Sequence, residues 1–227
     1  SAIHIHPLVT GGFNADFDGD TMGVFVPVSN EAVEEAKKML PSNNLFNTAT
    51  GGVMYQPTLE GQLGLHLLTQ YGASTDKKFA SGEDAVKAAK AGSVLFTDVV
   101  YIGDKRTTAG RWAFNQALPA SLRRDEYLTD ADKVMDRKNL NAVLTDLAKN
   151  KPTEFRDTID KIKDLGFGHA YDIGFSFKLD DFKPLSAIRD RHLAVADKKV
   201  AAINADKSLS AEDRKFRTVH AYTEATD

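Results

Sequence analysis

The feature that most constrains this chain is a short acidic run near its start, Asn14-Ala15-Asp16-Phe17-Asp18-Gly19-Asp20. Its three carboxylates occupy alternate positions, which an extended chain directs to one side at a spacing of roughly 7 Å. Gly19 permits a turn with positive φ that would bring them closer. Clustered anions with no basic residue beside them repel one another and ionise together only around a cation. Because all the ligands are oxygens, the run predicts a Mg²⁺ site, with Mn²⁺ as a substitute.

Two other interpretations of the acidic run compete with this one. An EF-hand loop also begins with alternating acids, but it requires Gly at its sixth position and Glu at its twelfth. Counted from Asp16, those positions hold Thr21 and Pro27, which excludes such a calcium loop. A solvated acidic turn is the other alternative. The apolar flanks argue against it, because their alternation predicts half-buried strands on both sides of the loop. These flanking residues are Ile3, Ile5, Leu8 and Val9 before the run, and Met22, Val24, Val26 and Val28 after it.

Composition narrows the classes of protein that remain. The 227 residues suffice for one large domain or two small ones, and a hydrophobic content of 42% supports a core. With a net charge of −3, the chain would rely on partners for much of any nucleic-acid-binding surface. The absence of cysteine excludes disulfides and cysteine-ligated zinc. No apolar run approaches the ~20 residues of a membrane span, and the opening residues do not form a signal peptide.

Caps and hydrophobic periodicity predict several helices and one clear strand downstream. The strand is expected over 93–101, which is apolar and β-branched. The stretch 72–91 reads as a loop and an exposed helix capped by Ser81. Four residues at helical spacing mark a buried helix face: Leu140, Val143, Leu144 and Leu147. Further helices are expected over 31–40, from Thr58, from Leu128, from Pro152 to Gly166, over 184–205 and from Ser210 onward.

Several of these segments, taken together, resemble a known family. His6-Pro7-Leu8-Val9, the acidic run and Val26-Pro27-Val28 are similar to the catalytic region of the largest (β′-type) subunit of multisubunit DNA-dependent RNA polymerases. The segment 106–119 resembles the rim of that family's secondary channel, and the segment 167–182 resembles its F-loop. Thr21, Gly23 and Phe25 depart from the family pattern beside the acidic run, but the three carboxylates are retained.

The resemblance implies an α+β chain, in which part of a double-psi β-barrel carries the metal loop and a mostly helical secondary-channel and F-loop region follows. It divides the chain into residues 1–71 (barrel part, metal loop and following helix), 72–120 (exposed helix, strand and channel rim) and 121–227 (helical region with the F-loop). It also implies that Asp16, Asp18 and Asp20 are the catalytic residues and hold Mg²⁺ for nucleotidyl transfer during transcription.

The resemblance further implies partners. These are a β-type polymerase subunit, the remaining β′-type fragments, template DNA, the RNA 3′ end and NTPs, without a membrane. The expected location is the bacterial cytoplasm, or a host cell or virion if the chain is a split subunit of a large-bacteriophage polymerase; a piece of a longer chain is the rival origin. We expect the chain alone to be inactive. Two other functions stay open: a non-catalytic assembly or binding module of a polymerase complex, and an unrelated Mg²⁺-dependent nuclease.

A few other polar residues are weaker candidates. Arg106 and Arg111 could meet phosphates, although ordinary salt bridges are the commoner role for each. The Asp180-Asp181 pair suggests a metal ligand, but adjacent acids point apart in a strand. This pair therefore favours a helix cap or a basic partner. The histidines have no ligand spacing, and His6 is expected to be structural.

Overall fold

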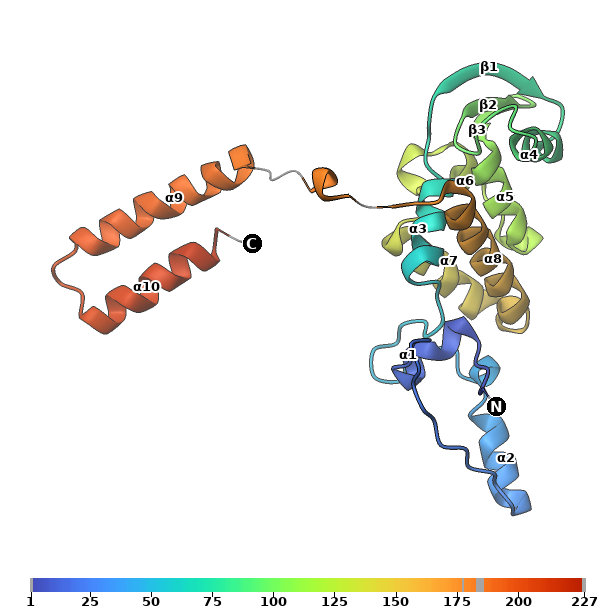
Figure 1. Ribbon diagram of the computed structural model, residues 1–227, viewed down its shortest axis with the longest axis horizontal. Helices are drawn as coiled ribbons and strands as arrows, with labels where there is room; N and C mark the ends of the chain where they lie inside the picture. Colours follow the sequence, from blue (N-terminus) through green and yellow to red (C-terminus); the bar gives the residue numbers. More distant parts are fainter. Residues whose placement is uncertain (1, 177, 183–185, 226–227) are drawn as a thin grey trace. The chain divides into compact units, whose positions relative to one another are not determined.

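The computed structural model describes residues 2–176, 178–182 and 186–225, and the chain divides into two compact units, Ser1–Phe175 and Ser176–Asp227 (Figure 1). The described helices of the first unit are α1 (Thr10–Phe13), α2 (Asn30–Lys38), α3 (Leu59–Leu68), α4 (Gly82–Lys90), α5 (Ala109–Ala117), α6 (Asp125–Thr129), α7 (Arg137–Asn150) and α8 (Phe155–Ile173). Its strands are β1 (Ser74–Phe79), β2 (Val99–Ile102) and β3 (Lys105–Thr108). The described helices of the second unit are α9 (Ser186–Ala205) and α10 (Ala211–Thr223).

The main core lies among α3, α5, α7 and α8, and it forms because each helix buries one apolar stripe. All four residues predicted to form the buried face of α7 are buried there. Leu65 of α3, Phe114 of α5 and Ile162 of α8 are almost completely inaccessible to solvent in the same cluster. Leu8, from the segment that precedes the acidic run, packs against the edge of this core. The core therefore reaches the chain segment that leads into the acidic run.

Glycines allow α3 and α8 to cross in backbone contact. A Cβ added at Gly64 would clash with the carbonyl oxygen of Gly166, and one added at Gly166 would clash with the carbonyl oxygen of Gly61. Phe167 lies against Gly61 from the same helix pair. Figure 1 shows α3 and α8 side by side in the centre of the unit. Because no side chain separates the two backbones here, this crossing leaves no room for a larger residue.

A small mixed sheet lies at one end of the first unit, in the order β1-β2-β3. β1 and β2 are parallel and are connected through α4, while β2 and β3 are antiparallel, with Val99 opposite Thr108 and Ile102 opposite Lys105. A second, smaller core of alanines and valines fills the space between α4, α5 and the strands. β3 leads directly into α5, within the segment 106–119 that resembles the rim of the secondary channel.

Side-chain caps account for several helix starts that the sequence predicted. Ser29, Ser81 and Ser210 each accept a hydrogen bond from the backbone N–H three residues ahead, at the starts of α2, α4 and α10. Thr58 occupies the N-cap of α3 but makes no side-chain capping bond. In α9, the expected helix is described from Ser186 to Ala205, and the earlier part of the prediction at 184–185 lies outside the described residues.

The strands expected around the acidic run do not form. The segment before it contains a 3-10 turn over Pro7–Val9 followed by α1, and residues 21–28 are extended without regular structure. Among the described residues, the backbone of 21–28 makes no hydrogen bond. A strand requires a neighbouring strand to form hydrogen bonds with its backbone, and the described residues supply none at that place. The double-psi β-barrel is therefore not confirmed.

Three other sequence predictions were wrong in their bounds. α8 does not end at Gly166 but continues to Ile173, where Gly174 adopts the left-handed conformation that terminates it. A helix is expected to start at Leu128, but α6 ends near that residue. A strand is expected over 93–101, but β2 begins only at Val99. β1 lies in the stretch 72–91, where the sequence predicts a loop and a helix but no strand. Its polar composition, which is typical of an edge strand, hides it from a search for apolar alternation.

The second unit, considered by itself, is a pair of antiparallel helices that contact each other. Ala196 of α9 and Ala221 of α10 are buried between them, and the Lys199 ammonium pairs with the Glu224 carboxylate at 2.6 Å. Small residues at the contact let the helix axes approach closely. In the part of the chain that is described, no helix combines the length and the apolar character needed to cross a membrane.

Candidate metal centre

The acidic run is held by a short stem that starts at His6. The Pro7–Val9 turn begins with the Val9 N–H donating to the His6 carbonyl oxygen at 3.0 Å, and the Thr10 hydroxyl donates to the Pro7 carbonyl oxygen at 2.7 Å. α1 then ends at Asn14, whose φ of 47° is left-handed. Asparagine adopts this conformation more readily than most residues. The stem therefore turns the chain sharply at the point where the acidic run begins.

Inside the run, carboxylates accept hydrogen bonds from backbone N–H groups of the same loop. The Asp18 N–H donates to Asp16 Oδ1 at 3.2 Å, and the Asp16 N–H donates to Asp20 Oδ2 at 3.2 Å. Gly19 has a φ of 114°, which an L side chain rarely adopts, so glycine is required at this turn. These contacts fold the extended spacing of the sequence into a compact loop.

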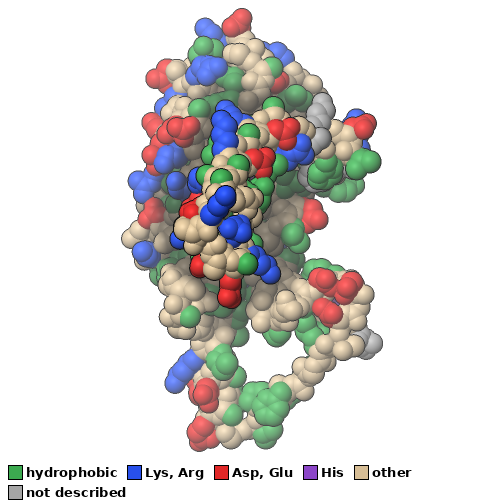
Figure 2. Space-filling view, turned by 90° about the vertical axis from the view of Figure 1, so that its left-hand side faces the viewer, with side chains coloured by type: hydrophobic (Ala, Val, Ile, Leu, Met, Phe, Trp, Pro, Cys, Tyr) green, Lys and Arg blue, Asp and Glu red, His purple; other side chains and the backbone are tan. Residues whose placement is uncertain are grey.

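The structure brings the three predicted site residues together. One carboxylate oxygen from each of Asp16, Asp18 and Asp20 lies within 4.8 Å of the other two. All three side chains are exposed, so an approaching molecule can reach them. Figure 2 shows acidic side chains gathered at the surface in the lower part of the first unit, next to uncovered apolar side chains. Three convergent and accessible oxygen ligands match the coordination that Mg²⁺ prefers in proteins.

The electrostatics of the loop also fit a cation. The pKa of the Asp18 carboxyl is raised, first by its hydrogen bond with the Asp16 side chain and then by the negative charge of Asp16. Among the described residues, none of the three carboxylates forms an ion pair with a basic side chain. The cluster is thus an uncompensated concentration of negative charge. A divalent cation is the partner that relieves this repulsion while retaining all three oxygens as ligands.

Of the weaker candidates, Arg111 has a different role from the one expected. Its side chain is completely buried and donates to four backbone carbonyl oxygens, those of Thr69, Tyr127, Asp130 and Ala131. Its guanidinium also lies 4.1 Å from the centre of the Tyr71 ring. Arg111 therefore pairs with no carboxylate and instead joins the end of α3 to α6 and to the turn that follows α6. Arg106, on β3, is exposed and lies 5.9 Å from the same ring.

The Asp180-Asp181 pair has a local role. The Asp181 carboxylate accepts a hydrogen bond from the Lys178 N–H at 3.0 Å at the start of the 3-10 helix Leu179–Asp181. This is the arrangement of a capping acid. Asp181 thus caps its own short helix. In the described part of the chain, the only group of three acids with convergent oxygens is that of the acidic run.

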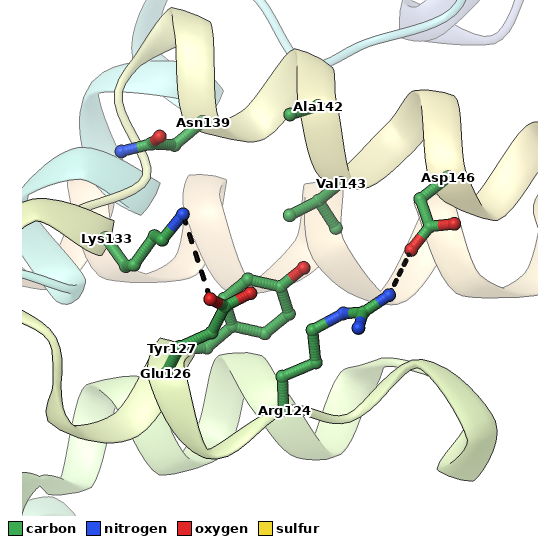
Figure 3. Close-up of a pocket in the computed structure, with 8 residues that line it drawn as sticks. All are labelled: Arg124, Glu126, Tyr127, Lys133, Asn139, Ala142, Val143 and Asp146. Carbon is green, nitrogen blue, oxygen red and sulfur yellow. Dashed lines mark hydrogen bonds and ion pairs between the residues drawn. The ribbon is translucent and has the colours of Figure 1, made fainter.

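A surface pocket of about 230 Å³ lies between the α6 region and α7 (Figure 3). Two ion pairs border it: Arg124 with Asp146 at 2.8 Å, and Lys133 with Glu126 at 3.9 Å. The Tyr127 ring lies between the two pairs in Figure 3. Because each charged side chain already faces one of opposite sign, the pocket offers no net charge for a ligand. Its features are explained by the packing of α6 against α7.

Comparison with known proteins relates the chain to one family. Residues 1–41 match the family model described as RNA polymerase Rpb1, domain 2, and this match includes the acidic run. The chain is 34% identical to the DNA-directed RNA polymerase subunit beta′ of Amoebophilus asiaticus over 228 residues, which cover 89% of this chain and 15% of that protein. It is also 34% identical over 248 residues to the protein of the same name from Thermotoga maritima, covering 100% of this chain and 14% of the relative.

A third relative gives the same result. The subunit beta′ of Leifsonia xyli subsp. xyli is 34% identical over 253 residues, which cover 100% of this chain and 19% of that protein. The chain thus spans less than a fifth of the length of each of these relatives. The similarity extends over the body (residues 59–175) and the helical pair of the second unit as well as the acidic run, so it is not confined to one short motif.

Proposed function

The chain belongs to the family of β′ subunits of DNA-directed RNA polymerase, and from this premise we propose that it carries the catalytic metal loop of such an enzyme. The single observation that carries the proposal is the convergence of the Asp16, Asp18 and Asp20 oxygens within 4.8 Å. This convergence occurs inside the segment that matches the family model. A chance acidic turn would need neither the stem that orients it nor a match over the whole chain.

In the proposed reaction, the 3′-hydroxyl of RNA attacks the α-phosphate of an NTP and pyrophosphate leaves. Bound Mg²⁺ would lower the pKa of that hydroxyl and stabilise the charge on the α-phosphate. The part of this chain is to hold the cation with three carboxylates and to leave its outer face open. Phosphoryl transfer requires positioning and electrostatic stabilisation rather than covalent chemistry from the protein, so one acidic loop is a sufficient contribution from this chain.

The loop is proposed to act only within a complex. Val24, Phe25 and Val28 follow the loop in an extended segment and are 76%, 88% and 91% exposed. Apolar residues this exposed on an unpaired extended backbone are suited to a β-barrel completed by other chains or segments. We infer a double-psi β-barrel formed with other β′-type segments, beside a β-type subunit. Template DNA, the RNA 3′ end and NTPs are the proposed ligands, in the cytoplasm.

The test is reconstitution of the chain with a β-type subunit and the remaining β′-type segments, followed by extension of an RNA primer on a DNA template. Asp18→Asn should abolish extension, because it removes one of three oxygen charges at the cation, while the complex still assembles. Asp76→Asn, an exposed acid on β1, is the matched control and should leave extension unchanged.

The outcomes separate the proposal from its rivals. Full extension by the Asp18→Asn complex would assign the chain to a non-catalytic assembly module. Degradation of nucleic acid by the isolated chain with Mn²⁺, lost in Asp18→Asn, would instead indicate a nuclease. Either result would overturn the proposed function.

A further inference from the structure

The His6 side chain ties the stem of the metal loop to α8. His6 Nε2 lies 2.8 Å from Asp160 Oδ1, and Asp160 is on α8. Lys163, one turn later on α8, lies 3.4 Å from the same carboxylate oxygen, 3.1 Å from Asp164 and 3.5 Å from His6 Nε2. The shorter contact of His6 Nε2 is the one to Asp160. Both the His6 and Asp160 side chains are about two-fifths exposed, so the contact is open to water on one side.

The other ring nitrogen of His6 fixes the direction of this hydrogen bond. His6 Nδ1 accepts a hydrogen bond from the Leu8 backbone N–H at 3.2 Å, and this caps the Pro7–Val9 turn. An Nδ1 atom that accepts carries no proton, so in the neutral ring the proton is on Nε2. Nε2–H then donates to Asp160. The imidazole therefore links a backbone N–H of the stem to a carboxylate of α8, an arrangement that holds a histidine ring in one tautomer.

A continuous set of short contacts runs from this imidazole to the acidic run. Leu8 packs on the core, and the Thr10 hydroxyl bonds to Pro7 across the turn. The Ala15 N–H then donates to the Thr10 carbonyl oxygen at 3.1 Å, directly before Asp16. Each step spans only a few residues, so the stem has little freedom between its anchor and the loop. Among the described residues, two side chains attach this stem to the body: Leu8 packs on the core, and His6 contacts α8.

We propose that His6 is a positioning residue for the metal loop, because it fixes the stem to Asp160 of α8 and so sets how closely the three carboxylates converge. This proposal rests on the proposed function of the same loop as a cation site. It makes Asp160, which lies more than a hundred residues away from the loop in the sequence, a determinant of cation affinity. It also joins the loop to the same helix whose backbone contacts α3.

The first experiment measures Mn²⁺ affinity of the full chain by the loss of the free Mn²⁺ signal in electron paramagnetic resonance. Asp160→Ala should weaken binding about 3- to 10-fold, since it removes a charge-assisted hydrogen bond that is partly open to water. Asp164→Ala removes a neighbouring carboxylate that contacts the same Lys163 but not His6, so it should change affinity less than about twofold. Equal affinities for the Asp160 and Asp164 variants would overturn the proposal.

Two substitutions of His6 separate the long-range link from the local cap. His6→Gln places an N–H donor near the position of Nε2 and can still reach Asp160, whereas His6→Asn keeps an acceptor for the Leu8 N–H but is too short to reach α8. The proposal expects His6→Gln to bind Mn²⁺ within about twofold of the wild type and His6→Asn to match Asp160→Ala. The reverse order would show that only the cap matters.

A spectroscopic readout keeps this inference distinct from the proposed function. Asp18→Asn should abolish Mn²⁺ binding; a wild-type chain with no Asp18-dependent binding would remove the proposed cation site. The amide resonance of Gly19, followed by NMR without metal, then still tests the link. It should shift in Asp160→Ala and stay in place in Asp164→Ala. An unshifted resonance in both variants would overturn the positioning role even if the cation site stands.

Discussion

The segment that carries the acidic loop and the body that follows it are stabilised by different kinds of interaction. In residues 2–58, the buried side chains are those of Leu45, Val53 and Pro57 only, and the loop is shaped by turns, caps and backbone hydrogen bonds. In residues 59–175, helices bury a continuous core. The body therefore gains its stability from packing, whereas the loop gains its geometry from local polar contacts.

This difference shows that the geometry of the acidic loop and the free energy of unfolding of the chain depend on largely separate sets of residues. Functional loops are commonly drawn from the less stable parts of a fold, because they must remain accessible and able to adapt. Here the two attachments of the stem are Leu8 in the core and His6 on Asp160. Apart from changes at Asp160, which anchors His6, changes in the body should alter unfolding and leave cation binding by the loop intact, and changes in the loop should do the reverse.

The largest effect is expected at the crossing of α3 and α8. Gly166→Ala should lower the free energy of unfolding by about 3 kcal/mol or more, because the new methyl group would clash with the carbonyl oxygen of Gly61 and neither backbone can easily move. Urea denaturation followed by circular dichroism measures this change.

Gly168→Ala provides the control on the same helix. A Cβ at Gly168 would meet no atom within 4 Å, and this residue is exposed. The same substitution should therefore stabilise the chain by about 0.5–1 kcal/mol, since alanine loses less backbone freedom in a helix than glycine does. Similar effects of the two substitutions would contradict the close helix crossing.

A smaller loss of stability is expected at the buried arginine of the body. Arg111→Lys should cost about 2–3 kcal/mol, because one ammonium cannot reach the four carbonyl oxygens that the planar guanidinium bonds or stack on Tyr71 in the same way. Thermal unfolding reports this change.

Arg106→Lys is the matched control for Arg111. Arg106 is exposed on β3 and is further from the Tyr71 ring, so its replacement should shift the unfolding free energy by less than about 0.5 kcal/mol. A larger cost for Arg106→Lys than for Arg111→Lys would show that the Arg111 guanidinium is not what joins α3 to α6 and the turn after it.

The body should also be sensitive to pH through His169, whereas the loop lacks a comparable buried group. His169 is 9% exposed, its ring stacks edge-on against Phe96, and its Nε2 has no partner among the described residues. Burial lowers the pKa of His169, and the charge of nearby Asp172 opposes this shift less strongly.

The sign of this effect follows from proton uptake on unfolding. A lowered pKa means that the unfolded chain binds the proton first, so His169 stabilises the fold above its ordinary pKa of 6.5 and that stability is lost as pH falls through the folded value. The slope contributed by one group is at most about 1.4 kcal/mol per pH unit. Urea midpoints between pH 7.5 and 5 should fall more steeply for the wild type than for His169→Gln. Parallel curves would exclude this role.

The sequence predicted best what is decided locally. The caps of α2, α4 and α10 depend on a serine and the N–H group three residues ahead, and the buried face of α7 depends on spacing within one helix. Convergence of the three acids is also decided locally, since it takes place within five residues, 16–20, that include the turn at Gly19. Patterns of this kind are complete within a short window of sequence.

The errors concern features decided by distant parts of the chain. The alternation at 22–28 indicates a strand, but a strand forms only where another backbone pairs with it. Gly166 looked like a helix end because its partner, α3, could not be known from the sequence of α8 alone. Arg111 looked like a phosphate or carboxylate ligand, since nothing near it in sequence reveals the four carbonyl oxygens that surround it.

The smallest effect on stability is expected at the loop itself. The raised pKa of Asp18 means that proton binding favours the folded loop below the ordinary value of 3.8, and that this contribution is lost as pH rises through the folded value. Near pH 7 no proton is shared between the carboxylates, so their negative charges repel one another. Asp18→Asn relieves part of this repulsion, so it should not lower the urea midpoint of the metal-free chain and should raise it at most slightly, since the exposed loop contributes nothing to the core.

The contribution of Asp18 should appear when a cation is added. Mn²⁺ at pH 7 should raise the unfolding temperature of the wild type, because a ligand that binds only the folded state stabilises it, and the rise should vanish in Asp18→Asn. It should also weaken as pH approaches 4, where protons compete for the same oxygens. Glu35→Gln, an exposed acid of α2 in the same segment, should retain the full rise. A rise that survives in Asp18→Asn would place the cation elsewhere and end the separation of site from stability.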